Sequence, residues 1–170
     1  MYDIGSLIVY GSTGVCRVKD ITTPDFSEDR NRLYYVLDPL YQDGLIYTPV
    51  DTGVFMRPVI SKEEALRLIE LIPTMTTQAY HERSVQRLAE HYKEAISTHD
   101  CADLIELAMS IYSKKLSAEM SGKKFGQVDE RFLRRAETLL FGEMAAALDI
   151  PADQVQSYIA QKVENSAADN

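Results

Sequence analysis

The chain has 170 residues, of which 45% are hydrophobic and 26% charged, a balance typical of a globular protein rather than a disordered or fibrous one. It carries 18 Lys and Arg against 26 Asp and Glu, a net charge of -8, which argues against a protein that finds nucleic acid unaided, because such proteins use positive charge to displace counterions from phosphate. Two widely separated cysteines, no secretory start and no apolar run long enough to span a bilayer predict a cytoplasmic protein without membrane association.

Residues 1–60 carry the pattern of a small β-domain. Five short runs rich in β-branched and aromatic residues are separated by turn residues. We expect these strands to close into a small antiparallel barrel, because closure removes exposed sheet edges. Residues 24–32 are predicted to form a longer, solvated hairpin loop. The five runs are SLIVY, GVCRVKDITT, LYYVLDPL, GLIYTPV and VFMRPVI.

The turn sequence GSTG at residues 11–14 resembles part of a phosphate-binding loop. It lacks the following Lys-Ser/Thr pair, and no helix follows that could donate backbone amides to a phosphate. We therefore predict a hairpin turn between the first two strands.

From Ser61 the hydrophobic period becomes helical, so we place a domain boundary at residue 60 and predict an α+β protein. Ser61 and Glu64 fit a capping box for the first helix, which Pro73 ends. Asp100 is the expected cap of the third helix, and Pro151 opens the fifth. The helical domain covers residues 61–164, and the tail 165–170 is expected to fray. The other boundaries are about 77 to 97 for the second helix, an end near Gly122 for the third, and about 128 to 148 for the fourth.

No pattern of residues indicates catalysis, a metal or a cofactor. The three histidines are not spaced as metal ligands, and only His99 with Cys101 comes close to forming a pair. No nucleophile elbow, zinc-protease motif or frame of paired carboxylates is present. We expect a non-enzymatic protein without a cofactor.

A local basic segment stands out in this acidic chain. Residues 112–135 contain seven Lys and Arg against three Asp and Glu, whereas residues 1–60 contain five against eight. One interpretation is a solvated helix face. The other is phosphate contact through Lys114, Lys115, Lys123 and Lys124, which requires that something else tether the protein to DNA, because a tethered module needs little affinity of its own.

Four tyrosines cluster in the β-region, at positions 34, 35, 41 and 47. Strand alternation should turn some of them toward solvent, and exposed tyrosines are favoured at protein interfaces. The alternative is that they cover their own sheet.

The segments IGSLIVYGSTGVCRV, YYVL, GLIYTPVD and MRPVIS resemble the N-terminal module of the CarD-like family of bacterial RNA-polymerase-binding factors. LIELAMSIYSKKLSAEMSGKKF and DERFLRRAETLLFGEMAAALDIP resemble the helical domain of that family, so the likeness covers about residues 4–163. It implies a Tudor-like β-domain that docks on the lobe of the polymerase β subunit, and helices that touch the upstream edge of the transcription bubble and stabilise open promoter complexes. The β-domain is shared with the transcription-repair coupling factor, but this chain has no Walker motif and is too short to hold a motor.

Carried over by position, the resemblance implies a polymerase-facing surface that binds by edge-to-edge strand pairing. Tyr47 departs from the family, whose well-known members place an arginine there. The residues of this surface are Arg32, Tyr34, Tyr35, Leu45 and Tyr47.

The chain has no tryptophan, although the family often carries one before the second helix as a wedge against the minor groove. Here the segment is TMTTQAYHERSVQR. Tyr80, with Arg83 and Arg87 beside it for phosphates, is one candidate replacement, and Val85 is the other. If DNA contact is lost with the tryptophan, the alternative function is a polymerase-binding adaptor that acts through its acidic helices. In both cases we expect a monomer.

Overall fold

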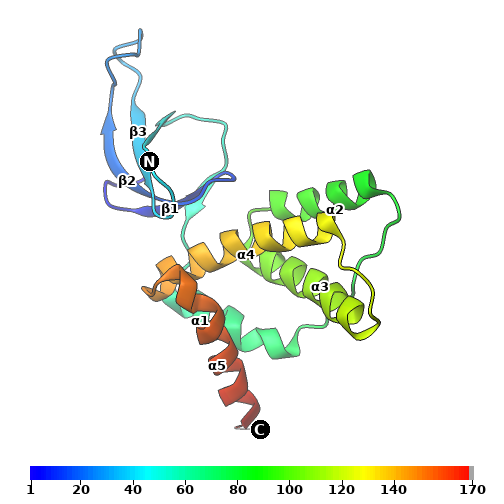
Figure 1. The fold of residues 1–170 in the computed structure, drawn as a ribbon. Coiled ribbons are helices and arrows are strands. Elements are labelled where there is room, and N and C mark those ends of the chain that lie inside the picture. Colours follow the sequence, from blue (N-terminus) through cyan, green and yellow to red (C-terminus); the bar gives the residue numbers. More distant parts are fainter. Residues whose placement is uncertain (169–170) are drawn as a thin grey trace.

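The computed structural model describes residues 1–168 and has an antiparallel five-stranded sheet followed by five α-helices (Figure 1). The α+β class is therefore confirmed, and every predicted strand region contains a strand. The strands are β1 Leu7–Tyr10, β2 Gly14–Thr22, β3 Tyr34–Pro39, β4 Ile46–Pro49 and β5 Met56–Pro58.

The expected closed barrel is not confirmed. The strand order is β4-β3-β2-β1-β5, so β4 and β5 form the two edges of an open sheet. The strand β5 has only three residues and ends at Pro58, and β4 ends at Pro49. Proline has no backbone N–H to give to a ladder, which favours these strands as edges. A register shift between Val18 and Asp20 in β2 marks a bulge, which bends the strand and increases its local twist.

The GSTG segment forms the predicted hairpin turn. Tyr10 and Gly14 are opposed at the end of the β1–β2 ladder, and Gly11 and Gly14 have positive φ angles of 45° and 93°. A side chain is also excluded at Gly11 for lack of space, because a Cβ there would lie 2.9 Å from Cγ1 of Val54. Both constraints select glycine at this corner.

The helices follow the predicted capping residues. The Ser61 side chain accepts a hydrogen bond from the backbone N–H of Glu64, and Asp100 accepts one from Asp103. Gly122, with φ of 67°, adopts the left-handed conformation just beyond the third helix, as predicted. The helices are α1 Lys62–Leu71, α2 Val85–Ser97, α3 Cys101–Met120, α4 Gln127–Leu148 and α5 Val155–Ala168, with short 3-10 turns η1 Ile72–Thr74 and η2 Ala152–Gln154.

One boundary prediction is wrong. The second helix starts at Val85 rather than near residue 77, because extended Ser84 caps it by accepting a hydrogen bond from the Arg87 N–H. The preceding segment is tied to α3 instead, where the Ser110 hydroxyl donates to the Gln78 carbonyl at 2.8 Å. The helix α5 extends to Ala168, and the fraying expected of residues 165–170 stays a prediction. Residues 169–170 lie outside the described part.

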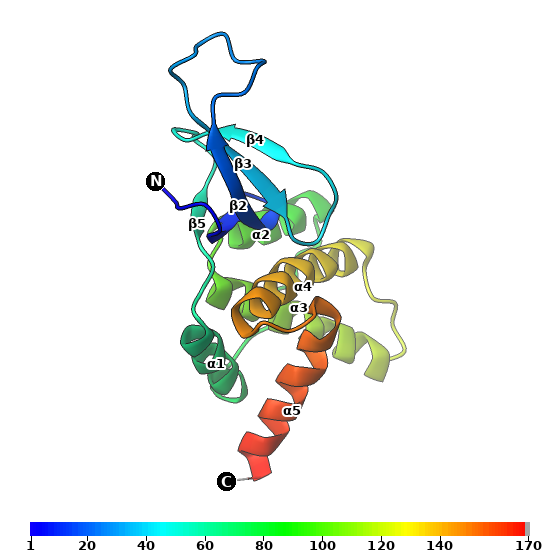
Figure 2. The same ribbon diagram turned by 90° about the vertical axis from the view of Figure 1, so that its left-hand side faces the viewer.

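Two separate apolar cores support the two halves of the molecule. The sheet core contains Ile8, Cys16, Val18, Tyr35 and Leu37, all buried. The larger helical core gathers residues from all five helices, with Ile111, Met144 and Val155 fully buried. Figure 2 shows the sheet standing on the helical layer above α4, with the loop of residues 24–32 projecting away from it. Among the described helices, none is long and apolar enough to cross a membrane.

We predict that Gly11→Ala lowers the free energy of unfolding by about 1–2 kcal/mol, the cost of a left-handed alanine, with the Val54 contact adding to it. Urea unfolding measures this value. Gly53→Ala is the matched control, because a Cβ there meets nothing within 4 Å and its φ is not positive. Equal stabilities of the two variants would contradict the assignment of a constrained turn.

Candidate functional site

Only some of the predicted polymerase-binding residues lie on the outer face of β3 and β4, because side chains alternate between the two faces of a sheet. Cross-strand pairing sets Tyr35 opposite Thr48 and Val36 opposite Tyr47. Tyr35 is only 2% exposed and belongs to the sheet core, where its hydroxyl accepts a hydrogen bond from the Tyr2 N–H. Since side chains alternate along a strand, Tyr34 and Tyr47 lie on the opposite face. Tyr35 is therefore a core residue, not a contact residue.

The free edge of β4 has backbone groups directed away from the sheet. The Val50 N–H donates to the Leu33 carbonyl at 3.0 Å, which fixes the phase of the β3–β4 ladder. In an antiparallel pair, alternate residues turn their N–H and C=O toward the partner. Thr48 and Ile46 therefore bond to β3, whereas Tyr47 and Leu45 present their backbone groups outward. In the described residues no strand pairs with this side of β4.

Exposed aromatic side chains border this free edge. Phe26, which is 64% exposed, packs edge-on against the rings of Tyr34 and Tyr47, with both centroid distances at 5.6 Å. The Arg32 guanidinium lies 5.8 Å from the Tyr34 centroid. We call Phe26, Tyr34, Leu45 and Tyr47 the aromatic edge. Phe26 was not predicted, although it is the one large apolar residue in the polar stretch 24–32.

An open hollow of about 790 Å³ lies beside the aromatic edge, between the strands and the base of the projecting loop. Phe26, Leu45 and Tyr47 form part of its apolar wall, together with Val36. Its charged members have mixed signs, with Lys19 against Asp20 and Asp25. A hollow of this composition can accept apolar side chains of a partner strand, with polar groups at its rim.

Lys114, a predicted DNA contact, is used inside the protein. Its ammonium group lies 2.8 Å from Asp129 Oδ1 and its side chain is 11% exposed. The Tyr92 hydroxyl donates to the same oxygen at 2.6 Å, so the three residues join α2, α3 and α4. Burial, reinforced by this hydrogen bond, raises the pKa of Tyr92 well above its ordinary value. Lys114 is therefore not available to a phosphate.

Lys115 and Tyr80 also differ from the prediction of free surface groups. Lys115 is half-buried on α3. Burial raises the pKa of the Glu137 carboxyl group on α4, and the positive charge of Lys115 partly opposes this rise. The Tyr80 ring is stacked on His91, with centroids 3.6 Å apart and ring planes within 12°. Val85, the other candidate replacement for a wedge, is 64% exposed at the start of α2.

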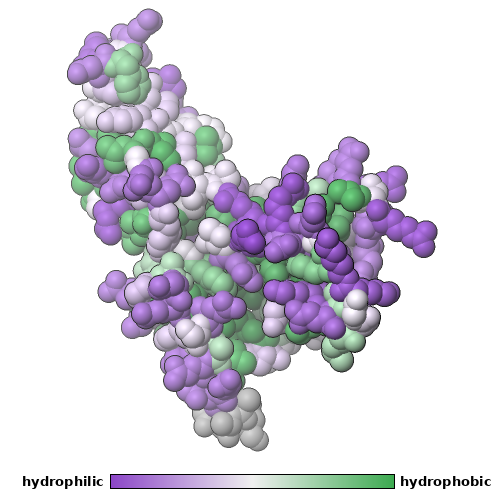
Figure 3. All heavy atoms as spheres, in the orientation of Figure 1, coloured by the Kyte–Doolittle hydropathy of each residue, from purple (hydrophilic) through white to green (hydrophobic). Residues whose placement is uncertain are grey.

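The remaining predicted basic residues, Arg83, Arg87, Lys123 and Lys124, gather with His81, which was not predicted, at the end of the helical part that lies away from the sheet (Figure 1). His81, Lys123 and Lys124 line one hollow of about 290 Å³. Arg83 and Arg87 are exposed at the start of α2, which lies at the same end in Figure 1. Figure 3 shows hydrophilic side chains projecting from this right-hand end. We call these five residues the basic end.

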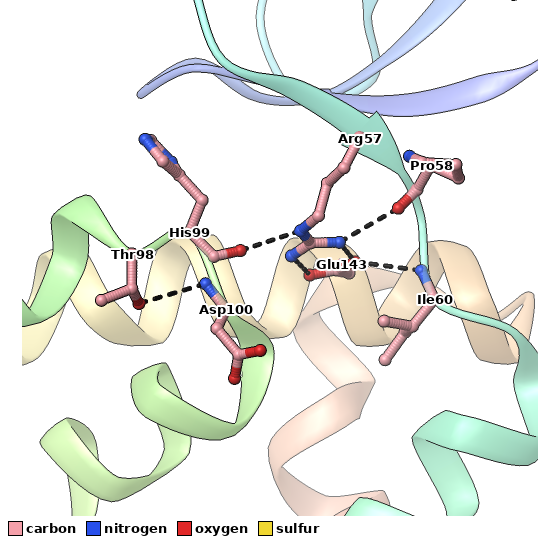
Figure 4. Close-up of polar contacts among 7 residues, drawn as sticks. All are labelled: Arg57, Pro58, Ile60, Thr98, His99, Asp100 and Glu143. Atoms are coloured by element: carbon pink, nitrogen blue, oxygen red, sulfur yellow. Dashed lines mark hydrogen bonds and ion pairs between the residues drawn. The ribbon is translucent and has the colours of Figure 1, made fainter.

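A buried ion pair, which sequence reasoning missed, joins the sheet to the helices (Figure 4). Arg57 of β5 donates through both terminal nitrogens to Glu143 of α4, at 2.6 and 2.7 Å. Its Nε donates to the carbonyl of His99, and the Ile60 N–H donates to Glu143. The usable signal was Glu143 itself, a carboxylate between the apolar-face residues Leu140 and Met144 of the predicted fourth helix.

Two further hydrogen bonds cross between the sheet domain and α4. The Tyr41 hydroxyl donates to the Gly142 carbonyl at 2.7 Å, and Arg135 donates to the Ser12 carbonyl. Tyr41 thus contacts the helices, and burial raises the pKa of its hydroxyl.

Within residues 1–168, no group of three His, Cys, Asp or Glu side chains is arranged to hold a metal ion. His99, which the sequence paired with Cys101, instead stacks on Phe55 at 4.4 Å. Cys101 is buried in the helical core.

A family model described as the CarD-like/TRCF RID domain matches residues 2–60. The match spans β1 to β5 and thus includes the aromatic edge and Arg57. No curated protein matches the sequence.

We predict that Lys114→Ala lowers the free energy of unfolding by about 3 kcal/mol, because it leaves the buried Asp129 carboxylate without its cation. Lys124→Ala removes an exposed lysine from the same region and should change it by less than about 0.5 kcal/mol. Chemical denaturation of both variants measures the difference. Equal values would show that Lys114 is a surface residue in solution.

Proposed function

We propose, from the premise that the N-terminal domain of this chain belongs to the CarD-like RNA-polymerase-interacting family, that the chain is a non-enzymatic transcription regulator. It docks on the lobe of the polymerase β subunit through the aromatic edge. Its basic end then contacts promoter DNA at the upstream edge of the bubble and stabilises the open complex. It acts as a monomer in the cytoplasm.

The free edge of β4 is the observation that carries the docking proposal. Leu45 and Tyr47 direct backbone N–H and C=O groups outward, and a strand of the partner can extend the sheet by bonding to them. Main-chain bonds supply affinity in this mode, while side chains of alternate residues supply specificity. The 790 Å³ hollow beside the edge provides room for those side chains.

The aromatic edge supports the same assignment. Phe26 and Tyr47 are 64% and 45% exposed, and large aromatic groups at an interface are typical centres of binding energy. Leu45, which is 43% exposed, adds apolar area beside them. Tyr47, where well-known members have an arginine, makes this interface less dependent on charge. We expect its affinity for polymerase to respond weakly to salt.

The basic end supports DNA contact only in the anchored state. A net charge of -8 opposes free DNA binding, whereas a docked module works at an effective concentration near millimolar. Contacts from Arg83, Arg87, Lys123 and Lys124 to four phosphates give a log-log salt slope of about -3.6. Regulation requires that the protein bind the open complex more tightly than the closed one. A difference of about 1.4 kcal/mol between the two binding free energies shifts the equilibrium between closed and open complex tenfold.

One observation favours the adaptor alternative. Tyr112, Leu116 and Met120 recur every four residues along α3 and are 48%, 43% and 90% exposed. An apolar stripe of this kind fits another protein better than a phosphate backbone. An adaptor would bind polymerase through β4 and a second protein through α3.

We predict that Tyr47→Pro weakens binding to the polymerase β subunit at least tenfold, because it removes an outward N–H of β4 without removing a bond of the β3–β4 ladder. Tyr47→Phe keeps the backbone donor and should bind like the wild type. Surface plasmon resonance with immobilised polymerase measures both affinities, and circular dichroism checks the fold. Wild-type binding by a folded Tyr47→Pro variant would refute edge pairing.

We predict that Lys123→Ala/Lys124→Ala shortens the lifetime of the promoter open complex formed with this protein and reduces its salt slope by about 1.8. The matched control is Lys62→Ala/Lys162→Ala, which removes two exposed lysines from α1 and α5, away from the basic end. A heparin-challenge assay at several salt concentrations measures both quantities. An unchanged lifetime with unchanged polymerase binding would favour the adaptor.

A further inference from the structure

We infer that Arg57 and Glu143 are positioning residues, which hold the aromatic edge and the basic end in one fixed geometry. If their ion pair is lost, the protein should stabilise the open complex less, while its affinity for polymerase should stay the same. The effect on the open complex rests on the proposed function, whereas the fixed geometry of the two halves is a property of the free protein.

Each half of the molecule has an apolar core of its own. The buried residues of the sheet core and those of the helical core form separate clusters. An apolar contact also joins them, where the buried Val9 and Val15 of the sheet line a cavity of about 20 Å³ together with Ile96, Leu104 and Leu139. Apolar burial is non-directional, so this contact holds the two halves together without by itself selecting one orientation between them.

The ion pair supplies a directional constraint because it joins three elements at one point (Figure 4). Glu143 is 2% exposed, and both of its oxygens accept from Arg57 while one also accepts from the Ile60 N–H. Arg57 in turn reaches the His99 carbonyl at 2.8 Å, at the corner between α2 and α3. A bidentate guanidinium–carboxylate pair fixes direction as well as distance, which one hydrogen bond does not.

The corner that receives Arg57 is itself unusual. His99 has a φ of 55°, a left-handed conformation that non-glycine residues seldom adopt. Its ring stacks on Phe55, two residues before Arg57, with planes within 9°. The backbone carbonyl and the ring of His99 thus both contact the segment around β5.

The length of α4 makes small angular errors important. The 16 residue steps from Gln127, where this helix begins, to Glu143 span about 24 Å at 1.5 Å per residue. A tilt of about 10° about Glu143 therefore moves the far end, beside Lys123 and Lys124, by roughly 4 Å, given that length. This displacement exceeds the length of a hydrogen bond, which is about 3 Å. A loosened junction would leave β4 able to bind polymerase while removing the lysines from their phosphates.

The test is Glu143→Gln, which keeps the side-chain shape and removes the charge. The matched control is Glu64→Gln, which makes the same change in an exposed pair with Arg67 on α1. Spin labels at Asp43→Cys and Gln127→Cys report the distance between the two halves in the free protein. The native thiols of Cys16 and Cys101 are buried, and burial raises the pKa of Cys16 to about 11, so labelling at neutral pH is selective.

We expect a single narrow distance distribution for the wild type and Glu64→Gln, and a broadened one for Glu143→Gln. The affinity of Glu143→Gln for polymerase should be within twofold of the wild-type value. The increase in open-complex lifetime that Glu143→Gln causes should be at least threefold smaller than the increase that the wild type causes. A narrow distribution in Glu143→Gln, or an undiminished lifetime, would overturn the inference. If Glu143→Gln does not fold, Arg57→Lys, which keeps the charge but not the bidentate geometry, is judged by the same criteria. Wild-type protein that fails to bind polymerase would refute the proposed function, while the distances in the free protein still decide on the ion pair.

Discussion

The ion pair between Arg57 and Glu143 is the interaction on which the arrangement of the two surfaces depends. Such a pair adds little net stability, because removing two charges from water costs nearly as much free energy as their attraction returns. Its contribution is geometric, since a buried carboxylate with 2% exposure accepts only an arrangement that satisfies both of its oxygens. The sheet and the helices have separate cores, and this pair adds a directional link to the hydrogen bonds that Tyr41 and Arg135 make between them.

A second buried carboxylate organises the helical half. Asp129 receives both the Tyr92 hydroxyl and the Lys114 ammonium group, and it thereby fixes α2, α3 and α4 around one point. The loop between α3 and α4 is held beside this point, with Lys123 and Lys124 left exposed. The internal lysine thus supports the position of the external ones. A mutation that treats all of them as equivalent would mix loss of stability with loss of contact.

Much of the fold follows from local patterns in the sequence. Strand alternation, the change of period at Ser61 and the caps at Ser61 and Asp100 predicted elements that the structure contains, because each depends on neighbours within a few residues. Barrel closure failed as a prediction, since it depends on the lengths and prolines of β4 and β5 and on their relative positions. The start of α2 was misplaced because the tertiary bond from Ser110 to Gln78 competes with local helix propensity.

The candidate sites were less predictable than the fold for the same physical reason. Tyr34 and Tyr35 are adjacent and chemically identical, and only the phase of the ladder separates the half-buried ring from the buried one. Lys114 and Lys124 differ only in whether a distant aspartate reaches them. The composition of the basic segment was visible in the sequence, but its division into structural and exposed lysines required the packing of three helices.

An acidic protein with one basic end is well suited to act only where it is anchored. Polymerase binding through an exposed strand edge would supply location, and the basic end would supply a modest preference for open promoter DNA. The measurement that tests this account most directly is the lifetime of a promoter open complex with and without the wild-type chain, at a concentration that saturates polymerase. The account predicts a lifetime about tenfold longer, which corresponds to about 1.4 kcal/mol of differential binding. A lifetime that does not change while the protein is bound to polymerase would contradict it.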